Sequence, residues 1–170
     1  MQVIDNLITL YLNNKNPRAL KKHKILMVCL GNICRSPLAE GILKSKVDRS
    51  KILVDSAGTG DWHVGQEPDS RSIAVGKKYD IDITPQRGRQ FTAKDFEDFD
   101  IIYVMDNSNM ENVLALAEND SQKKKVKLIL NEIFPGENVD VPDPYFGGDL
   151  GFENVFKMLD EACDQIANRF

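Results

Sequence analysis

The chain has 170 residues, 42% hydrophobic and 28% charged, which is the composition of one globular domain with a sizeable core. Its net charge of -4 argues against nucleic-acid binding, because proteins of that class usually carry a basic surplus. Two histidines supply too few ligands for a Cys/His zinc site. No run approaches the ~18 apolar residues that membrane insertion requires. Because the chain has three cysteines and no secretory leader is recognised, we expect a reducing, cytoplasmic compartment.

Residues 1–23 are predicted to be an N-terminal extension that precedes a domain at residues 24–170. The apolar residues of the extension recur three and four positions apart, which is typical of an amphipathic helix. They are Val3, Ile4, Leu7, Ile8, Tyr11 and Leu12. We expect this extra helix to pack on the domain surface, and a partner-binding or dimerising arm is the alternative.

From residue 24 onward, strand and helix patterns alternate along the chain. Strands are predicted at residues 24–30, 51–55, 100–105 and 126–130, and helices at residues 37–47, 69–79, 107–119 and 150–168, with a short helix after a capping box at residues 92–95. Asp69 is the expected cap of the second helix. This alternation predicts an α/β fold with a doubly wound, four-stranded parallel sheet and helices on both faces. A ligand site is then expected beyond the carboxyl ends of the strands.

The first strand, the loop after it and the next helix start form a predicted anion site. The strand ends at Cys29, a loop containing glycine follows, and Ser36 with Pro37 is a favourable N-cap and first helical position. Loop N–H groups and the positive end of the helix dipole converge on an anion in such a loop. The planar guanidinium of Arg35 can hold two phosphate oxygens. We therefore expect phosphoryl transfer with Cys29 as a thiolate nucleophile.

The spacing of Cys29 and Arg35 is a weak signal without its context. Cys163 and Arg169 have the same spacing, but no glycine lies between them and their segment is typical of a helix end. We expect this second pair to be structural. The preceding strand, the glycine and the Ser-Pro helix start distinguish the first pair.

The segment from Val28 to Pro37 resembles the phosphate-binding loop of the low-molecular-weight protein tyrosine phosphatases. Residues 54–59, 62–65, 99–106 and 141–146 resemble further segments of that family, in the same order. The resemblance covers about residues 24–170. It implies an enzyme that hydrolyses phosphotyrosine in proteins or peptides without a metal or cofactor, and that binds inorganic phosphate or a similar oxyanion competitively.

Asp143 is the candidate proton donor for the leaving group of a phosphate monoester. An Asp-Pro pair alone is typical of a turn, but Pro142 and Pro144 restrict the backbone on both sides of this residue. The resemblance implies that Asp143 is the general acid and base. Cys29 would take the phosphoryl group, Asp143 would protonate the leaving phenol, and the same carboxylate would then activate water against the cysteinyl phosphate.

The remaining loop residues are expected to shape the phosphate site. They are Leu30, Gly31, Asn32, Ile33, Cys34 and Ser36. The Ser36 hydroxyl can donate to the Cys29 sulfur, which favours the thiolate. Cys34 is interpreted as a protective partner that forms a reversible disulfide with Cys29 under oxidation.

Asn32 and Ser56 are expected to support the loop rather than react. Asparagine tolerates the left-handed backbone that a tight loop often requires. Many relatives carry a supporting histidine at the position that corresponds to Tyr79, so Tyr79 is the third expected support, with a hydroxyl of different reach.

Three aromatic residues, Trp62, Tyr145 and Phe146, match positions that wall the cleft in relatives. Isolated aromatic residues more often belong to the core. A deep cleft with flat walls would admit an aryl phosphate to Cys29 and exclude the shorter seryl phosphate.

Three other functions remain as alternatives. An arsenate reductase needs resolving cysteines, and residues 80–110 contain none. A protein-arginine phosphatase is closer, but that branch typically has threonine where this chain has Ile33. A non-enzymatic phosphoprotein-binding module would be expected to lose the nucleophile or the acid, and Cys29, Arg35 and Asp143 are all present.

Overall fold

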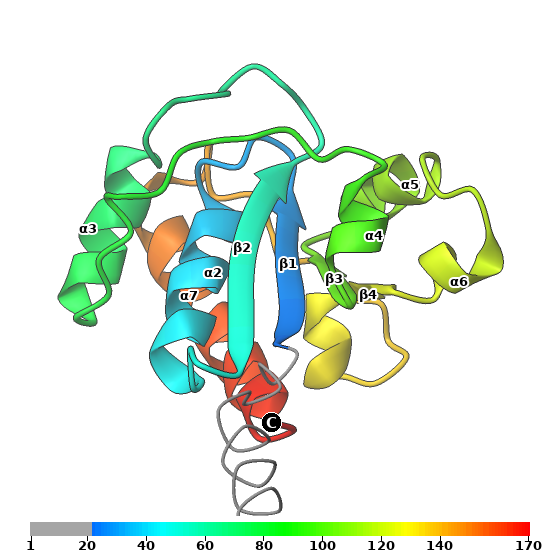
Figure 1. The fold of residues 1–170 in the computed structure, drawn as a ribbon. Coiled ribbons are helices and arrows are strands. Elements are labelled where there is room, and N and C mark those ends of the chain that lie inside the picture. The colour runs from blue at the N-terminus through cyan, green and yellow to red at the C-terminus, as the bar shows by residue number, and fades with distance from the viewer. Residues whose placement is uncertain (1–21) are drawn as a thin grey trace, which may run out of the picture.

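The computed structural model describes residues 22–170, so the helix predicted in the N-terminal extension lies outside the described residues. Four parallel strands form one sheet in the order β2-β1-β3-β4 (Figure 1). They are β1 (His23–Cys29), β2 (Ile52–Gly58), β3 (Ile101–Val104) and β4 (Val126–Leu128). The predicted doubly wound, four-stranded α/β fold is confirmed.

Helices cover both faces of the sheet. One layer contains α2 (Arg35–Lys46) and α7 (Gly148–Ala167), with α3 (Ser70–Lys78) packed beside them. The other layer contains α4 (Asp95–Asp98), α5 (Asn107–Leu114) and α6 (Asp120–Lys123), and the 3₁₀ helix η1 (Ile129–Glu132) follows β4 (Figure 1). None of the helices among residues 22–170 is long and apolar enough to cross a membrane.

Strand β1 contributes to two hydrophobic cores, because successive side chains of a strand point to opposite faces. Ile25, Met27 and Cys29 belong to the core beneath α2 and α7, whereas Leu26 and Val28 belong to the core beneath α4 and α5. All five side chains are buried. This is why the run reads as continuously apolar, and it fixes the strand end that carries Cys29.

Several predicted boundaries differ from the observed ones. Helix α2 begins at Arg35, so Ser36 lies inside the helix and the prediction of Ser36 as the N-cap is wrong; Cys34 occupies the cap position without a side-chain cap hydrogen bond. The physical reason is that the Ser36 hydroxyl contacts Cys29 and Asn32 within the loop and so does not cap the helix. The prediction of Asp69 as a cap is confirmed, because its side chain accepts from Arg71 N at 2.9 Å.

The ends of other helices and strands also differ from the prediction. The helix expected at residues 107–119 ends earlier, at Leu114, and a separate short helix, α6, begins at Asp120 after Asn119, whose side chain accepts from Gln122 N. The strand expected at residues 126–130 ends at Leu128, where the 3₁₀ helix begins. Strand β2 runs on to Gly58, beyond the predicted end at residue 55.

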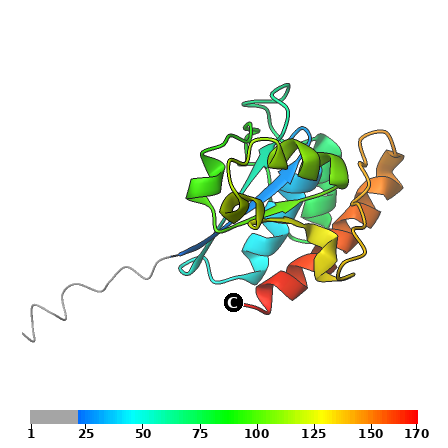
Figure 2. The ribbon, with the colours of Figure 1, turned by 90° about the vertical axis from the view of Figure 1, so that its right-hand side faces the viewer.

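The carboxyl ends of the strands lie at one edge of the sheet, and the loop after β2 rises above this edge (Figure 2). Cys29, Gly58 and the residues after Val104 therefore meet at this edge. A site at this edge draws side chains from segments that are far apart in sequence.

Candidate active site

The loop between β1 and α2 folds around the sulfur of Cys29. The backbone N–H of Asn32 donates to Cys29 Sγ at 3.3 Å, and Ser36 Oγ lies 3.0 Å from the same sulfur. Ser36 Oγ accepts a hydrogen bond from the Asn32 amide at 2.8 Å, and its own proton has two acceptors within reach, the sulfur and, at 3.4 Å, Ala57 O. Both groups hold the sulfur at the centre of the loop.

Asn32 supports the loop through its backbone and its side chain. Its φ of 55° is the left-handed conformation expected from the sequence. The side-chain amide donates to Ser36 Oγ and, at 2.9 Å, to Ser56 Oγ, while its carbonyl oxygen accepts from Arg89 N at 3.0 Å. The Arg89 N–H fixes which way the amide group faces. Ser56 Oγ donates in turn to the buried carboxylate of Glu40.

Gly58, at the end of β2, allows the loop to lie against the neighbouring strand. A Cβ at this position would lie 2.8 Å from Leu30 O and 3.0 Å from Asn32 N. The loop is also held by hydrogen bonds from Thr59 N to Cys29 O and from Gly60 N to Leu30 O, both 2.9 Å. A side chain at residue 58 would force the loop backbone away from β2.

Arg35 is nearly fully buried at the first position of α2. Its Nη1 donates to Asp106 Oδ2 at 2.6 Å and to Val141 O at 2.9 Å, and its Nη2 lies 3.5 Å from Asp143 Oδ2. Burial alone would lower the pKa of Arg35, but the negative charges of Cys29, Asp106 and Asp143 raise it overall. Because both of these hydrogen bonds use Nη1, the Nε and Nη2 hydrogens can donate to two oxygens of an anion beside the Asp143 carboxyl group.

Asp143 reaches the site from the segment between η1 and α7. This segment is anchored by Val141 N, which donates to Met105 O at 2.8 Å. Asp143 Oδ1 accepts from Tyr145 N at 3.1 Å, and its side chain is 43% exposed. The carboxyl group is thus held beside Arg35 while it stays in contact with solvent.

Arg71 joins this segment to α3. Its guanidinium donates to both carboxylate oxygens of Asp69 and, through Nη1, to Tyr145 O at 3.0 Å. It also lies over the rings of Tyr145 and Phe152, with 5.2 Å and 4.6 Å to the ring centroids. Hydrogen bonds from Arg71 lower the pKa of Asp69. Asp69 N donates to Ile33 O at 2.8 Å, so the start of α3 contacts both parts of the site.

Cys29, Arg35 and Asp143 line one pocket of about 240 Å³. Its lining residues are Cys29, Leu30, Gly31, Ile33, Cys34, Arg35, His63, Asp143, Tyr145 and Phe146. The pocket therefore combines the sulfur, the guanidinium and the carboxyl group with aromatic and aliphatic walls. No group of three or more His, Cys, Asp or Glu side chains within residues 22–170 is arranged to hold a metal ion.

The other two cysteines have different surroundings from Cys29. Burial, together with the negative charges of Asp69, Cys29 and Asp143, raises the pKa of Cys34 to about 12, so this group is a neutral thiol at pH 7. Cys163 is fully buried on α7, 3.8 Å from Ala39 O, and burial raises its pKa as well. Cys163 lies outside the pocket lining, as expected for the second Cys-x5-Arg pair.

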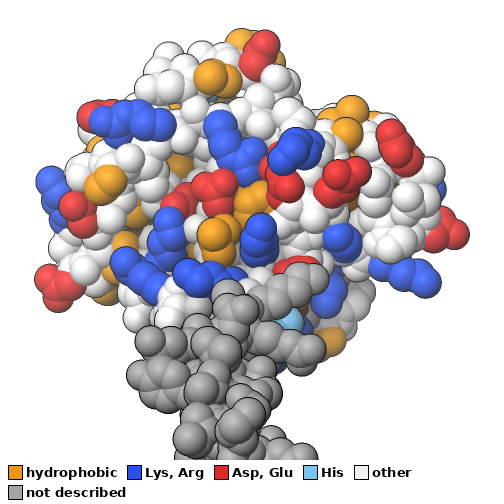
Figure 3. All heavy atoms as spheres, in the orientation of Figure 1, with side chains coloured by type: hydrophobic (Ala, Val, Ile, Leu, Met, Phe, Trp, Pro, Cys, Tyr) orange, Lys and Arg blue, Asp and Glu red, His pale blue; other side chains and the backbone are white. Residues whose placement is uncertain are grey.

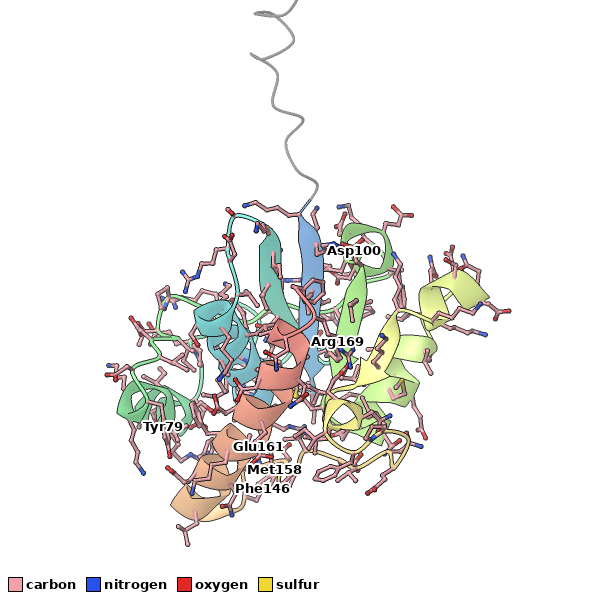
Figure 4. All side chains as sticks on the ribbon, turned by 90° about the horizontal axis from the view of Figure 1, so that it is seen from below. Tyr79, Asp100, Phe146, Met158, Glu161 and Arg169 are labelled. Atoms are coloured by element: carbon pink, nitrogen blue, oxygen red, sulfur yellow. The ribbon has the colours of Figure 1, made fainter. Side chains whose placement is uncertain are left out.

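Two predicted site residues lie elsewhere. The Tyr79 hydroxyl donates to Glu153 of α7 and its ring stacks on Phe156 at 4.1 Å, so its expected contact with the loop is wrong; Figure 4 shows it at the end of α3. The supporting polar group is instead the Glu40 carboxylate. Trp62 is 66% exposed and is not among the residues that line the pocket, where its neighbour His63 contributes. Trp62 lines an adjoining hollow that includes Leu30.

Sequence reasoning also missed four residues that shape the site: Glu40, His63, Arg71 and Asp106. Asp106 carried a usable signal, because it follows the buried strand β3 and such positions meet the end of β1. It is also the N-cap of α5, where its Oδ1 accepts from Asn109 N at 2.7 Å. Glu40 and Arg71 lie on helix surfaces whose partners are set only by tertiary packing.

Comparisons with known proteins show the family of this chain. The model of the family described as low molecular weight phosphotyrosine protein phosphatase matches residues 24–170. A putative low molecular weight protein-tyrosine-phosphatase from Synechocystis sp. is 44% identical over 147 residues, which are 84% of this chain and 93% of that relative.

Solved structures share the fold over most of the chain. A crystal structure of a protein tyrosine phosphatase from Entamoeba histolytica has a TM-score of 0.81 at 37% identity and covers 87% of this chain and 96% of its own. The Drosophila arginine phosphatase has a TM-score of 0.79 at 38% identity and covers 86% and 96%. The chain therefore belongs to the low molecular weight phosphotyrosine protein phosphatase family.

Proposed function

We propose that this chain hydrolyses phosphotyrosine in proteins or peptides, with Cys29 as nucleophile, Arg35 as phosphate clamp and Asp143 as general acid and base. The single observation that carries the proposal is that these three side chains line one pocket. The catalytic domain is proposed as residues 24–170, the range that the family model matches. A cytoplasmic location is proposed because the reaction needs Cys29 in its reduced form.

In the first step, the Cys29 thiolate attacks phosphorus. The sulfur–phosphorus bond forms while the bond from phosphorus to the tyrosine oxygen breaks. Arg35 and the loop N–H groups stabilise the negative charge on the equatorial oxygens. Asp143, in its protonated form, transfers its proton to the departing phenolate oxygen, so neutral tyrosine leaves.

In the second step, water attacks the cysteinyl phosphate. The Asp143 carboxylate takes a proton from this water, the phosphorus–oxygen bond forms, and the sulfur–phosphorus bond breaks. The Ser36 hydroxyl, 3.0 Å from the sulfur, stabilises the thiolate as it leaves. Inorganic phosphate is the product, and it is therefore expected to bind competitively in the same pocket.

The pocket walls support selection of an aryl phosphate. Tyr145 and Phe146 line the pocket and make an edge-to-face contact with ring centroids 5.0 Å apart. Ile33 adds an aliphatic side chain to the lining. A flat aromatic ring packs between such walls. A seryl phosphate is too short to hold its phosphorus at Cys29 and contact the walls at the same time.

The resemblance to an arginine phosphatase makes phosphoarginine the competing substrate, because that structure is 38% identical to this chain. The substrate assay compares phosphotyrosine, phosphoserine and phosphoarginine peptides, with arsenate reduction measured in parallel. We expect kcat/KM to be highest for phosphotyrosine. A higher kcat/KM for phosphoarginine, or reduction of arsenate, would show that phosphotyrosine is not the preferred substrate.

Substitutions test the roles of the individual groups. Cys29→Ser should abolish turnover of an aryl phosphate with an unchanged circular dichroism spectrum, whereas Cys34→Ser, which removes a thiol from the same loop, should retain turnover. Asp143→Ala should lower kcat on phenyl phosphate by about 10²–10⁴-fold. The loss on p-nitrophenyl phosphate should be much smaller, because nitrophenolate leaves without a proton, and equal losses on both would remove Asp143 from the acid role.

A further inference from the structure

A second hollow, of about 410 Å³, lies next to the catalytic pocket. It is formed by the loop after Cys29, the segment that follows β2, residues 90 and 91, and the end of α5 with the turn behind it. Leu30, Trp62, Phe91 and Leu116 supply its apolar walls. All of the described residues that line it are uncharged, in contrast to the catalytic pocket with Arg35 and Asp143.

The two hollows share one lining residue, Leu30. This side chain follows the nucleophile directly, lines both hollows and is 40% exposed. A peptide whose phosphotyrosine fills the catalytic pocket therefore has the second hollow beside its neighbouring residues. An extended peptide advances about 3.4 Å per residue with alternating side-chain directions, so one of these residues can turn into the hollow.

Three of the four apolar side chains that line the hollow are exposed, and the fourth, Phe91, is buried. Trp62 and Leu116 are 66% and 46% exposed. Figure 3 shows hydrophobic side chains at the surface over the loop after β2 and again above α5. Adjacent exposed side chains of this size, with uncharged surroundings, are typical of a surface that binds an apolar ligand.

The position of Trp62 depends on a glycine. A Cβ on Gly60 would lie 1.9 Å from Trp62 Cζ3 and 2.3 Å from Cε3, so the indole rests directly on the backbone of residue 60. This contact holds the ring as a wall of the hollow even though most of its surface faces solvent. The hollow is thus built by the local sequence.

We infer that this hollow is a substrate subsite, which receives an apolar side chain located within a few residues of the phosphotyrosine. The inference rests on the proposed function and adds a preference among phosphotyrosine substrates. An acidic neighbour finds no cation in the lining. Peptides with leucine or phenylalanine at the matching position are therefore the favoured class, above peptides with aspartate or serine there.

The experiment measures phosphate release from phosphotyrosine peptides that carry leucine, serine or aspartate at each of the positions from −3 to +3. At one position, leucine should raise kcat/KM about tenfold over serine, mainly through KM, from partial burial of its side chain. Leu116→Asp should remove this preference, because it places a charge in the hollow. Hydrolysis of p-nitrophenyl phosphate, which has no neighbouring residues, should be unchanged.

Met158→Asp is the matched control. Met158 is 36% exposed on α7 (Figure 4) and is not among the residues that line the hollow, so this variant should keep the leucine preference. Gly60→Ala gives a second, independent perturbation, because its Cβ displaces the Trp62 ring and should also remove the preference.

The outcomes separate this inference from the proposed function. Uniform rates for all peptides, a preference for aspartate, or a leucine preference that survives Leu116→Asp would overturn the subsite while the phosphatase activity stands. Failure to hydrolyse both phosphotyrosine peptides and p-nitrophenyl phosphate would overturn the proposed function itself, and the subsite with it.

Discussion

Replacement of Asn32 tests how the phosphate-binding loop keeps its shape. The Asn32→Ala variant loses the hydrogen bonds to Ser36 Oγ and Ser56 Oγ and the one from Arg89 N. At about 1 kcal/mol of net stability per bond, this loss is about 3 kcal/mol. An alanine at a φ of 55° costs roughly 1–2 kcal/mol more, so the free energy of unfolding should fall by about 4–5 kcal/mol in total.

Asn32→Gly is the matched comparison. Glycine loses the same hydrogen bonds but adopts the positive φ freely, while its larger freedom in the unfolded chain offsets roughly 0.5–1 kcal/mol of that gain. The glycine variant should therefore be more stable than the alanine variant by about 1 kcal/mol. Urea unfolding followed by circular dichroism measures this difference.

Both Asn32 variants should also lower kcat on p-nitrophenyl phosphate, because the Ser36 oxygen loses a donor and the loop N–H groups lose their support. Equal free energies of unfolding for the two variants would refute the argument from backbone strain. Wild-type kcat in both variants would refute the supporting role of the side chain.

Three further predictions concern other parts of the site. Asp106→Ala removes the 2.6 Å ion pair of the buried Arg35 and should lower the free energy of unfolding by roughly 3–5 kcal/mol. Inorganic phosphate should raise the Tm of this variant more than it raises the Tm of the wild type. Iodoacetamide at pH 7 should alkylate Cys29 and spare Cys34, because burial and nearby negative charges raise the pKa of Cys34 to about 12. Mass spectrometry of peptides measures the modification of each cysteine, and comparable modification of both would contradict this prediction. Gly58→Ala should lower the free energy of unfolding, measured in urea, by about 1–3 kcal/mol and should also lower kcat, because the added Cβ would lie 2.8 Å from the loop backbone. Wild-type values of both would show that the loop does not need this close approach.

The parts of the fold that the sequence predicts are those in which local pattern and tertiary structure agree. Strand β1 is apolar throughout because both of its faces are buried, and the glycine loop and helix after it follow the expected order. The left-handed conformation of Asn32 was predictable from the tolerance of asparagine for it. In these places the prediction needed no knowledge of distant contacts.

The errors arise where a side chain has a choice of partners. Ser36 has the chemistry of an N-cap, but the structure uses its hydroxyl between Cys29 and Asn32. Tyr79 has a hydroxyl of suitable type, but α7 presents Glu153 and Phe156 to it. Neither choice is encoded in the residue type or its spacing, because each depends on which helix packs alongside.

The start of α3 contacts both the nucleophile loop, through Asp69 N and Ile33 O, and the acid segment, through Arg71 and Tyr145 O. The proposed nucleophile and the proposed proton donor are therefore both tied to the same helix start. The spacing between the Cys29 sulfur and the Asp143 carboxyl group depends in this way on how α3 packs, although α3 contributes no side chain to the pocket lining.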